Sequence, residues 1–276
     1  MTLHDDVPRV LRTPAERAAA TEENLLALFR AMAVLPGYDR LARPGVMAHY
    51  APFSNAMFQG AWSPTLAGHD TDAVLDEVGA WFADHQSATH FWWFNDNMQP
   101  ADFGERLERR GYALNFEGDP AMVGDLAAMP DPVVPPGHTV ELATSATDLA
   151  AWRDVFAAAY ELPASLGQAW IDAAAAVANM GTPWQLYLAR GHGEPLGTSL
   201  LYCGGGVAGL FAVGTVPAAR GRGIGAALTL APMRDARARG YHHGVLFASP
   251  LGQPVYERLG FTDTGRRIRR YLYVKR

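Results

Sequence analysis

The 276-residue sequence contains one cysteine, one lysine and no apolar run of the roughly 20 residues that a membrane span requires. The single Cys203 excludes an internal disulfide and a cysteine-based metal cluster, which is typical of a reducing compartment. Residues 1–6 lack the basic and then apolar order of a signal peptide. We therefore expect a cytoplasmic protein without a membrane partner.

Charge is scarce and unevenly placed. Charged residues make up 18% of the sequence and hydrophobic residues 49%, which favours packed cores over disorder. Residues 1–136 carry 19 acidic and 9 basic side chains, a net charge of −10, whereas residues 137–276 carry 9 and 14, a net charge of +5. The positive half favours a polyanionic ligand. No long basic tract occurs and the acidic half would repel phosphate backbones, so a nucleic-acid partner is not expected.

No metal site is expected either. Eight of the nine histidines lie outside any metal-ligand spacing with a partner carboxylate. His242 and His243 are adjacent, so in a strand they would point to opposite faces.

The strongest pattern lies in residues 215–227. The apolar run at 209–213 predicts a buried strand before this segment, and residues 226–239 have the composition of a helix after it. Glycines allow a sharp turn and a close approach of backbone N–H groups to a ligand, and the start of the helix favours negative charge. The segment therefore predicts a phosphate-binding loop with three glycines in five positions: Gly221, Gly223 and Gly225.

Two familiar phosphate-binding motifs do not fit this loop. A Walker loop ends in Gly-Lys-Ser/Thr, but Ala226 follows the third glycine and the only lysine is Lys275. The dinucleotide fingerprint also requires an acidic residue after a second strand. Between residues 234 and 244 the only carboxylate is Asp235, which lies inside the predicted helix.

A third motif fits better. Arg220, Gly223 and Gly225 match Arg/Gln-x-x-Gly-x-Gly/Ala, with Pro217 three residues upstream. About 30 residues beyond the loop, residues 256–261 read Tyr-x-x-Leu-Gly-Phe. In both motifs and their order, the second half of the chain resembles the GNAT superfamily of acetyltransferases.

The resemblance implies acetyl-CoA as the co-substrate and requires no metal. In the family, the glycine loop holds the pyrophosphate, and the backbone of the preceding strand pairs with the pantetheine arm and polarises the acetyl carbonyl. The cofactor-binding positions implied here are Val213, Gly214, Thr215, Arg220, Gly221, Arg222, Gly223, Ile224, Gly225, Ala226 and Ser249.

The resemblance also implies a catalytic residue. Tyr256 matches the general acid of the family, which protonates the leaving thiolate after direct attack of an amine on the thioester. A phenol stays protonated at neutral pH and is suited to that role. The alternative is a core tyrosine at the end of a helix.

Two departures from the family pattern leave the general base open. Ser249 stands where many members have an asparagine that contacts the cofactor. The predicted strands at 210–215 and 245–249 contain no carboxylate, although many members have a glutamate on the central strands. Glu161 and His192 are candidates for the base, and nothing in the sequence selects between them.

The function expected from the resemblance is an acetyl-CoA-dependent N-acetyltransferase that acts on an amine of a small molecule or peptide. The alternative is a non-catalytic acyl-CoA-binding sensor module, which the missing base favours. A homodimer is compatible with both. In the family, the segment matching residues 160–170 lines the acceptor pocket, and three aromatic residues would surround it here: Tyr160, Trp170 and Trp184.

The order of predicted elements in the second half, β-α-α-β-β-β-α-β-α-β, is that of the family. We expect an α/β (α+β) fold with a mixed, mostly antiparallel sheet flanked by helices, in two tandem GNAT-like domains. The proline-rich residues 130–137 predict a linker. Residues 1–129 would form the N-terminal domain and residues 138–276 the catalytic domain.

The N-terminal domain is expected to be a degenerate copy of the same unit. Residues 90–94 predict a strand, and the helix after them ends in Gly111 and Tyr112, as the helix at 254–259 ends in Gly260 and Phe261. A glycine loop is missing between strand and helix. Two roles stay open for this half: it closes the acceptor pocket, or it serves only in packing or dimerisation.

Overall fold

The computed structural model describes four stretches of the chain: residues 6–31, 37–52, 56–178 and 184–275. The chain divides into two compact units, which we describe separately. Unit 1 consists of Met1–Ala31 and Ala121–Thr264, and unit 2 consists of Met32–Pro120 and Gly265–Arg276. Each unit is assembled from two separate segments of the sequence, whereas the domains expected from the sequence are contiguous. The limits of those domains stay a prediction.

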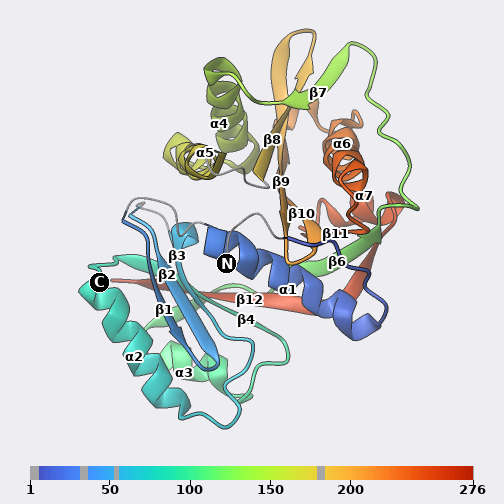
Figure 1. The fold of residues 1–276 in the computed structure, drawn as a ribbon. Helices are drawn as coiled ribbons and strands as arrows, with labels where there is room; N and C mark the ends of the chain where they lie inside the picture. The colour runs from blue at the N-terminus through green and yellow to red at the C-terminus, as the bar shows by residue number, and fades with distance from the viewer. Residues whose placement is uncertain (1–5, 32–36, 53–55, 179–183, 276) are drawn as a thin grey trace. The chain divides into compact units, whose positions relative to one another are not determined.

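The sheet of unit 1 has the strand order β6-β11-β10-β9-β8-β7 (Figure 1). Strands β10 and β11 are parallel, and the other neighbouring strands are antiparallel. The strands are β6 (Pro120–Asp125), β7 (His138–Leu142), β8 (Trp184–Gly191), β9 (Glu194–Gly204), β10 (Val207–Thr215) and β11 (His243–Phe247).

Strand β12 (Phe261–Val274) begins beside β6 in the same unit. The hydroxyl of Thr262 donates to the carbonyl of Val123 at 3.2 Å, and that of Thr264 donates to the carbonyl of Ala121 at 2.9 Å. Strand β6, from the first half of the sequence, therefore lies between two strands of the second half.

The helices of unit 1 cover both faces of its sheet. Figure 1 shows α4 and α5 to one side of β8 and β9 and α6 to the other. Successive residues of β11 point to opposite faces of the sheet. Leu246 packs in the hydrophobic cluster that contains residues of α6, whereas Val245 packs with Ala20 of α1. The helices are α1 (Pro14–Ala31), α4 (Ala146–Tyr160), α5 (Ala164–Ala178), α6 (Ile224–Ala238) and α7 (Gln253–Arg258), with a 3₁₀ turn η3 (Pro217–Ala219).

Helix α1 is joined to the β9–β10 hairpin by a buried asparagine. The Asn24 side-chain nitrogen donates to the carbonyl of Gly204 at 2.8 Å and lies 3.3 Å from the carbonyls of Tyr202 and Val207. Gly209 makes this approach possible, because a Cβ there would overlap the Asn24 amide. A helix from the start of the chain is thus an integral part of unit 1.

Unit 2 has a sheet of order β1-β2-β3-β4-β12, with β5 also paired to β12. Strands β3 and β4 are parallel and the other pairs are antiparallel. Helices α2 and α3 cover one face, where Phe82 and Leu107 pack on Trp92. The elements are β1 (Asp39–Arg43), β2 (Val46–Tyr50), the 3₁₀ turn η2 (Ala56–Phe58), β3 (Gln59–Trp62), α2 (Thr71–Asp84), β4 (Thr89–Asn95), α3 (Phe103–Arg109) and β5 (Tyr112–Phe116).

The parallel pair with its connecting helix occurs in both units, as β10-α6-β11 and as β3-α2-β4. The two helix starts differ in charge. Gly223 is the N-cap of α6, whereas the Asp70 carboxylate caps α2 by accepting from the Ala73 N–H at 3.1 Å, with Asp72 in the first turn. Acidic side chains at the start of α2 disfavour a second anion there.

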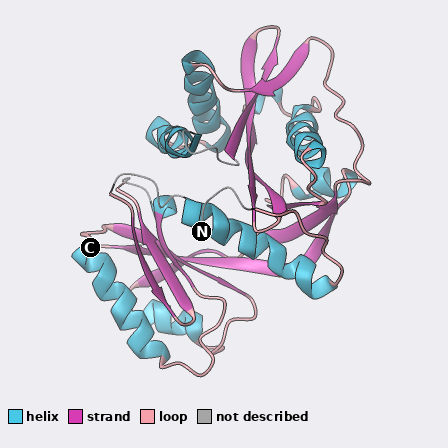
Figure 2. Cartoon of the chain, in the orientation of Figure 1, coloured by secondary structure: helices cyan, strands magenta, loops and turns pink. Residues whose placement is uncertain are grey.

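Most of the expected elements are confirmed, including the strand at His138–Leu142 and the helix at Ala146–Tyr160. The mixed α/β class, with a mostly antiparallel sheet flanked by helices, is also confirmed (Figure 2). Strand β1 was not expected. The residue pattern near the start of the chain predicts a helix over residues 15–35 and a turn near Ser54. The structure describes the helix as Pro14–Ala31, and Ser54 lies outside the described residues. In the part of the chain that the structure describes, no helix is long and apolar enough to cross a membrane.

Candidate functional site

Strand β10 carries a bulge at the place where the sequence predicts the acyl-binding backbone. Its register with β9 shifts between Phe211 and Gly214, and Ala212 adopts a φ of +51°. A residue other than glycine rarely adopts this left-handed conformation, which costs of order 1–3 kcal/mol. The backbone at Val213 therefore departs from regular strand geometry.

Two side chains hold the bulge. The Thr198 hydroxyl, on β9, donates to the carbonyl of Ala212 at 3.0 Å, and the Tyr160 hydroxyl donates to the carbonyl of Val213 at 2.8 Å. Thr198 is completely buried. With these two carbonyls already bonded within the protein, the bulge is fixed from the side of β9 and α4.

The sheet opens beside this bulge. The pairing of β10 with β11 consists of Ala208 with Gly244 and Gly209 with Val245, and it goes no further along these two described strands. The remainder of β10 pairs with β9 alone. The backbone after Gly209 is thus available on its β11 side to an extended ligand.

The glycine loop follows directly and ends in α6. Gly221 and Gly223 have φ values of +76° and +83°, a conformation that favours glycine. A Cβ on Gly221 would meet no atom within 4 Å, and one on Gly225 would meet only the Thr215 hydroxyl at 4.0 Å. The first N–H groups of a helix have no partner within it, and Gly223 supplies no side-chain cap. These features fit a phosphate group.

The arginines of the loop bind backbone carbonyls of the loop, of the end of β10 and of α4. Arg220 donates from Nε to the carbonyl of Thr215 at 3.1 Å and from Nη2 to the carbonyl of Ala159 at 3.0 Å. Arg222 donates to the carbonyl of Ala218 at 2.9 Å. In this structure both side chains fix the backbone, and their positive charge stays next to the start of α6.

Tyr256 and the loop belong to one hydrophobic cluster. Tyr256 is 8% exposed and packs in the cluster that includes Ile224, with Val213 packed against it from β10. Its ring lies 5.9 Å from that of Phe261, edge to face. The fold therefore brings the predicted acid, the start of α6 and the bulge together.

Ser249 has a local structural role. Its hydroxyl accepts from the Gly252 N–H at 3.2 Å, and its carbonyl accepts from the N–H groups of Gly252 and Gln253 at 2.9 Å. These contacts hold the turn that starts α7, the helix of Tyr256. A direct contact of Ser249 with the cofactor stays a prediction.

The three aromatic residues expected around an acceptor do not form one group. Trp170 and Trp184 are buried with their rings 5.9 Å apart, and the Trp184 ring lies 5.7 Å from that of Tyr202. Tyr160 is 42% exposed and stands at the bulge with its ring 4.9 Å from Phe156. Tyr160 joins the acceptor segment to the predicted acyl site through its bond to the carbonyl of Val213.

The two candidates for the general base differ in their surroundings. Glu161 is the exposed C-cap of α4 and follows Tyr160 directly in the chain. His192 lies in the β8–β9 turn, where its backbone N–H donates to the carbonyl of Gly137 and its ring lies 6.0 Å from that of His138. Glu161 is thus adjacent to a residue that contacts the bulge.

The only thiol is unsuited to nucleophilic catalysis. Cys203 is completely buried in β9, and this burial raises the pKa of its thiol to about 12. A thiol that stays protonated and inaccessible is a poor nucleophile.

The sequence does not predict that the side chains of Tyr160 and Thr198 hold the bulge. The family resemblance places Tyr160 at an acceptor pocket and gives no role to Thr198. Thr198 and Ala212 are 14 residues apart in the sequence, and Tyr160 and Val213 are 53 apart. Neither contact leaves a local pattern that a single sequence could reveal.

Comparison with known proteins finds a family match for the part of the chain that contains the bulge and the glycine loop. A family model described as an acetyltransferase (GNAT) domain matches residues 136–249. The mycothiol acetyltransferase of Streptomyces bingchenggensis is 31% identical over 151 residues, which cover 49% of this chain and 46% of that protein. The matched part thus spans about half the length of the curated relatives.

Solved structures share the fold over most of the chain. A GCN5-related N-acetyltransferase from Kribbella flavida superposes with a TM-score of 0.67 at 17% identity, covering 93% of this chain and 95% of that one. A tandem GNAT protein from the clavulanic acid biosynthesis pathway superposes with a TM-score of 0.59 at 14% identity, covering 99% and 97%. The expected GNAT-like fold is confirmed, and residues 136–249 of this chain form a GNAT acetyltransferase domain.

Proposed function

We propose that this protein is an acetyl-CoA-dependent N-acetyltransferase that acts on the amine of a small molecule. The observation that carries the proposal is the bulged β10, which opens away from β11 and leads straight into an uncapped glycine loop at the start of α6. An extended thioester with a pyrophosphate at one end matches both parts of this surface.

Each part has a proposed role. The N–H groups of residues 221–226 bind the pyrophosphate, aided by the positive end of α6 and the charges of Arg220 and Arg222. The backbone at residues 213–215 binds the pantetheine arm and donates to the thioester carbonyl, where negative charge develops during attack. Electrostatic stabilisation of this kind commonly supplies a large part of the rate enhancement.

Proton transfer completes the proposed reaction. The acceptor nitrogen attacks the thioester carbon, the C–S bond breaks, and the Tyr256 hydroxyl donates its proton to the departing thiolate. The amine proton leaves to Glu161, His192 or water. Tyr256 recovers a proton from solvent after the products leave.

The acceptor is proposed to be a small molecule because the matched relative is named a mycothiol acetyltransferase. The test is free-thiol release from acetyl-CoA with a panel of amines that includes the acceptor of the mycothiol acetyltransferases and short peptides. Robust thiol release with one small-molecule amine supports the proposal, whereas turnover with peptides alone contradicts the acceptor class.

A second function, an acyl-CoA-binding sensor without turnover, is favoured by two observations. The Ser249 hydroxyl is used within the α7 turn, and β10 and β11 contain no carboxylate. The sensor would bind CoA as tightly as the proposed enzyme does, but it would release no thiol above background with any acceptor in the panel. A single acceptor with robust turnover would remove this function.

A further inference from the structure

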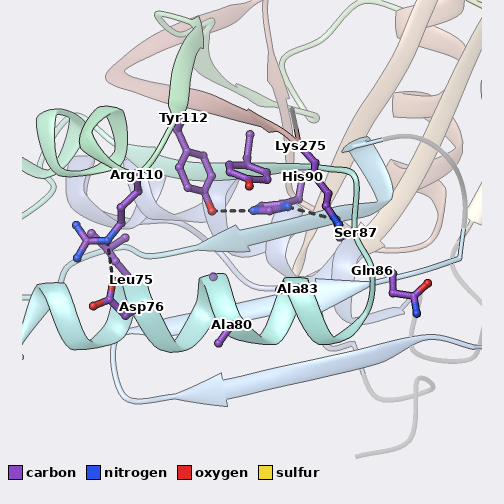
Figure 3. Close-up of a pocket in the computed structure, with 12 residues that line it drawn as sticks. Leu75, Asp76, Ala80, Ala83, Gln86, Ser87, His90, Arg110, Tyr112 and Lys275 are labelled. Carbon is purple, nitrogen blue, oxygen red and sulfur yellow. Dashed lines mark hydrogen bonds and ion pairs between the residues drawn. The ribbon is translucent and has the colours of Figure 1, made fainter.

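Unit 2 contains a pocket with a volume of about 340 Å³ beside the C-terminal half of α2 (Figure 3). Its walls come from α2 and the turn after it, from β4, and from the ends of α3, β5 and β12. The volume lies at the lower end of the range for small-molecule sites. The acetyl-transfer chemistry proposed for unit 1 gives this pocket no role.

A hydrogen-bond chain of fixed direction lies along one wall. The Gln59 side-chain nitrogen donates to the carbonyl of Ala51, so the amide oxygen faces Ser87 and accepts its proton at 2.6 Å. This is the shorter of the two contacts in which the Ser87 hydroxyl acts as donor. With its single proton used, the Ser87 oxygen accepts from Nδ1 of His90 at 3.3 Å.

The hydrogen-bond chain ends at the hydroxyl of Tyr112, in the wall of the pocket (Figure 3). Burial lowers the pKa of His90 to about 3 and raises that of Tyr112, so both are neutral at physiological pH. Because the His90 proton is on Nδ1, its Nε2 accepts from the Tyr112 hydroxyl at 2.7 Å. The Tyr112 oxygen has then used its proton and can only accept from a ligand.

Two cationic side chains line the pocket, and they differ in their ionic partners. Arg110 is bound by two carboxylates, Asp76 at 2.9 Å from Nε and Asp72 at 3.0 Å from Nη2. Lys275, the only lysine of the chain, is exposed, and within the described residues it forms no ion pair. Its backbone N–H donates to the carbonyl of Ala88 at 2.8 Å, which fixes its Cα beside the pocket.

One wall of the pocket is aromatic. The ring of Tyr273 lies 4.8 Å from that of His90 and 5.3 Å from that of Tyr112, and all three side chains line the pocket. Gly79, which also lines the pocket, occupies the interior of α2, where glycine costs about 1 kcal/mol relative to alanine. A Cβ there would meet no atom within 4 Å, so close packing does not require this glycine.

We infer that the pocket of unit 2 binds a planar aromatic monocarboxylate that carries a hydroxyl or amine. The carboxylate pairs with the Lys275 ammonium, the ring lies on the aromatic wall, and the hydroxyl or amine donates to the Tyr112 oxygen. Gly79 leaves the space that the ring occupies.

Calorimetry on the full chain tests the inference with 3- and 4-hydroxybenzoate as probes. Benzoate lacks the donor and methyl 4-hydroxybenzoate lacks the charge. At least one of the two hydroxybenzoates should bind. Compared with the hydroxybenzoate that binds more tightly, benzoate should have an affinity roughly fivefold lower, and the ester an affinity lower by roughly tenfold or more.

Two variants locate the binding. Gly79→Leu fills the pocket from a helical position, and Lys275→Gln removes the charge at an exposed position. Each substitution should lower the affinity for the more tightly bound hydroxybenzoate by roughly tenfold or more. The matched controls are Ala73→Leu, exposed on the same helix, and Arg40→Gln, an exposed cation of the same unit, and both should bind as the unaltered chain does.

Absence of binding by both hydroxybenzoates would overturn the inference, as would binding that survives Gly79→Leu in a folded variant. Unchanged affinity in Lys275→Gln, or equal affinity for the ester and the acid, would overturn the assignment of an anion. If Gly79→Leu does not fold, the Lys275→Gln result and the ester comparison decide the matter, because neither alters the packed interior. None of these measurements depends on acetyl transfer.

Discussion

The phenolic oxygen of Tyr160 lies 2.8 Å from the carbonyl oxygen of Val213 and donates its proton to it. This bond links the end of α4 to the bulge of β10, where Ala212 holds a left-handed conformation. Since the carbonyl of Val213 is bound from the α4 side, its peptide plane is fixed. We attribute to this contact the orientation of the backbone that is proposed to bind the thioester.

Tyr160→Phe should therefore raise KM for acetyl-CoA by roughly fivefold, the value of one hydrogen bond of about 1 kcal/mol. Steady-state kinetics and calorimetry with CoA measure the effect. Tyr241→Phe is the matched control, because it removes a bond of the same length, 2.8 Å to Asp6, from the same unit. Equal effects of the two substitutions would assign Tyr160 a purely structural role.

Tyr256→Phe should lower kcat by roughly a hundredfold or more while the affinity for CoA stays the same. Phenylalanine keeps the packing of the ring against Phe261 and removes only the hydroxyl that is proposed to protonate the thiolate. Single-turnover thiol release and CoA calorimetry separate the two quantities. A variant with full kcat would exclude Tyr256 as the general acid.

Acid should destabilise unit 2 through two buried histidines. Burial lowers the pKa of His49 and of His90 from 6.5 to about 3. Below pH 6.5 the unfolded chain binds more protons than the folded one, so the free energy of unfolding decreases as the pH falls towards 3. The decrease is roughly 1 kcal/mol per pH unit for each histidine.

Urea unfolding at pH 7, 6 and 5 measures this dependence. His90→Asn should reduce the slope of the free energy of unfolding against pH by the contribution of one histidine. His69→Asn, at an exposed position, should leave this slope unchanged. The same pH dependence in all three proteins would show that His90 does not contribute.

A chain that begins at Pro135 should not fold into unit 1. It lacks α1 and β6, and with them the contacts of Val123 and Ala20 with Val207 and Val245. Near-UV circular dichroism should show no fixed tertiary packing. The control is the full chain cut at a protease site inserted after the exposed Val133, which keeps every strand and should stay folded. A cooperative unfolding transition in the shortened chain would refute the prediction.

Local pattern was sufficient to predict the parts of the site that local chemistry dictates. Gly221 and Gly223 adopt a left-handed backbone conformation that favours glycine, so the loop could be recognised from its residues alone. Helix α4 begins at a Ser145 capping box and ends at Tyr160, and it takes the place of the first helix in the expected order of elements.

Contacts between distant residues set the features that the sequence could not predict. Ala212 has no left-handed preference of its own, and its conformation depends on bonds from Thr198 and Tyr160 at the bulge. The residues of β6 predict an ordinary apolar strand. Its place between β11 and β12 depends on pairing with residues more than 100 positions away, such as Val123 with Val245.

The central claim, that the start of α6 binds the pyrophosphate of CoA, is tested most directly at Gly225. This residue has an ordinary φ and room for a side chain, so Gly225→Glu leaves the backbone unstrained and places a carboxylate in the first turn, where it favours the helix. By calorimetry the variant should lose at least roughly a hundredfold in CoA affinity, with Gly225→Gln as the uncharged control of equal size and a smaller loss. Unchanged CoA affinity in a folded Gly225→Glu protein would contradict the account.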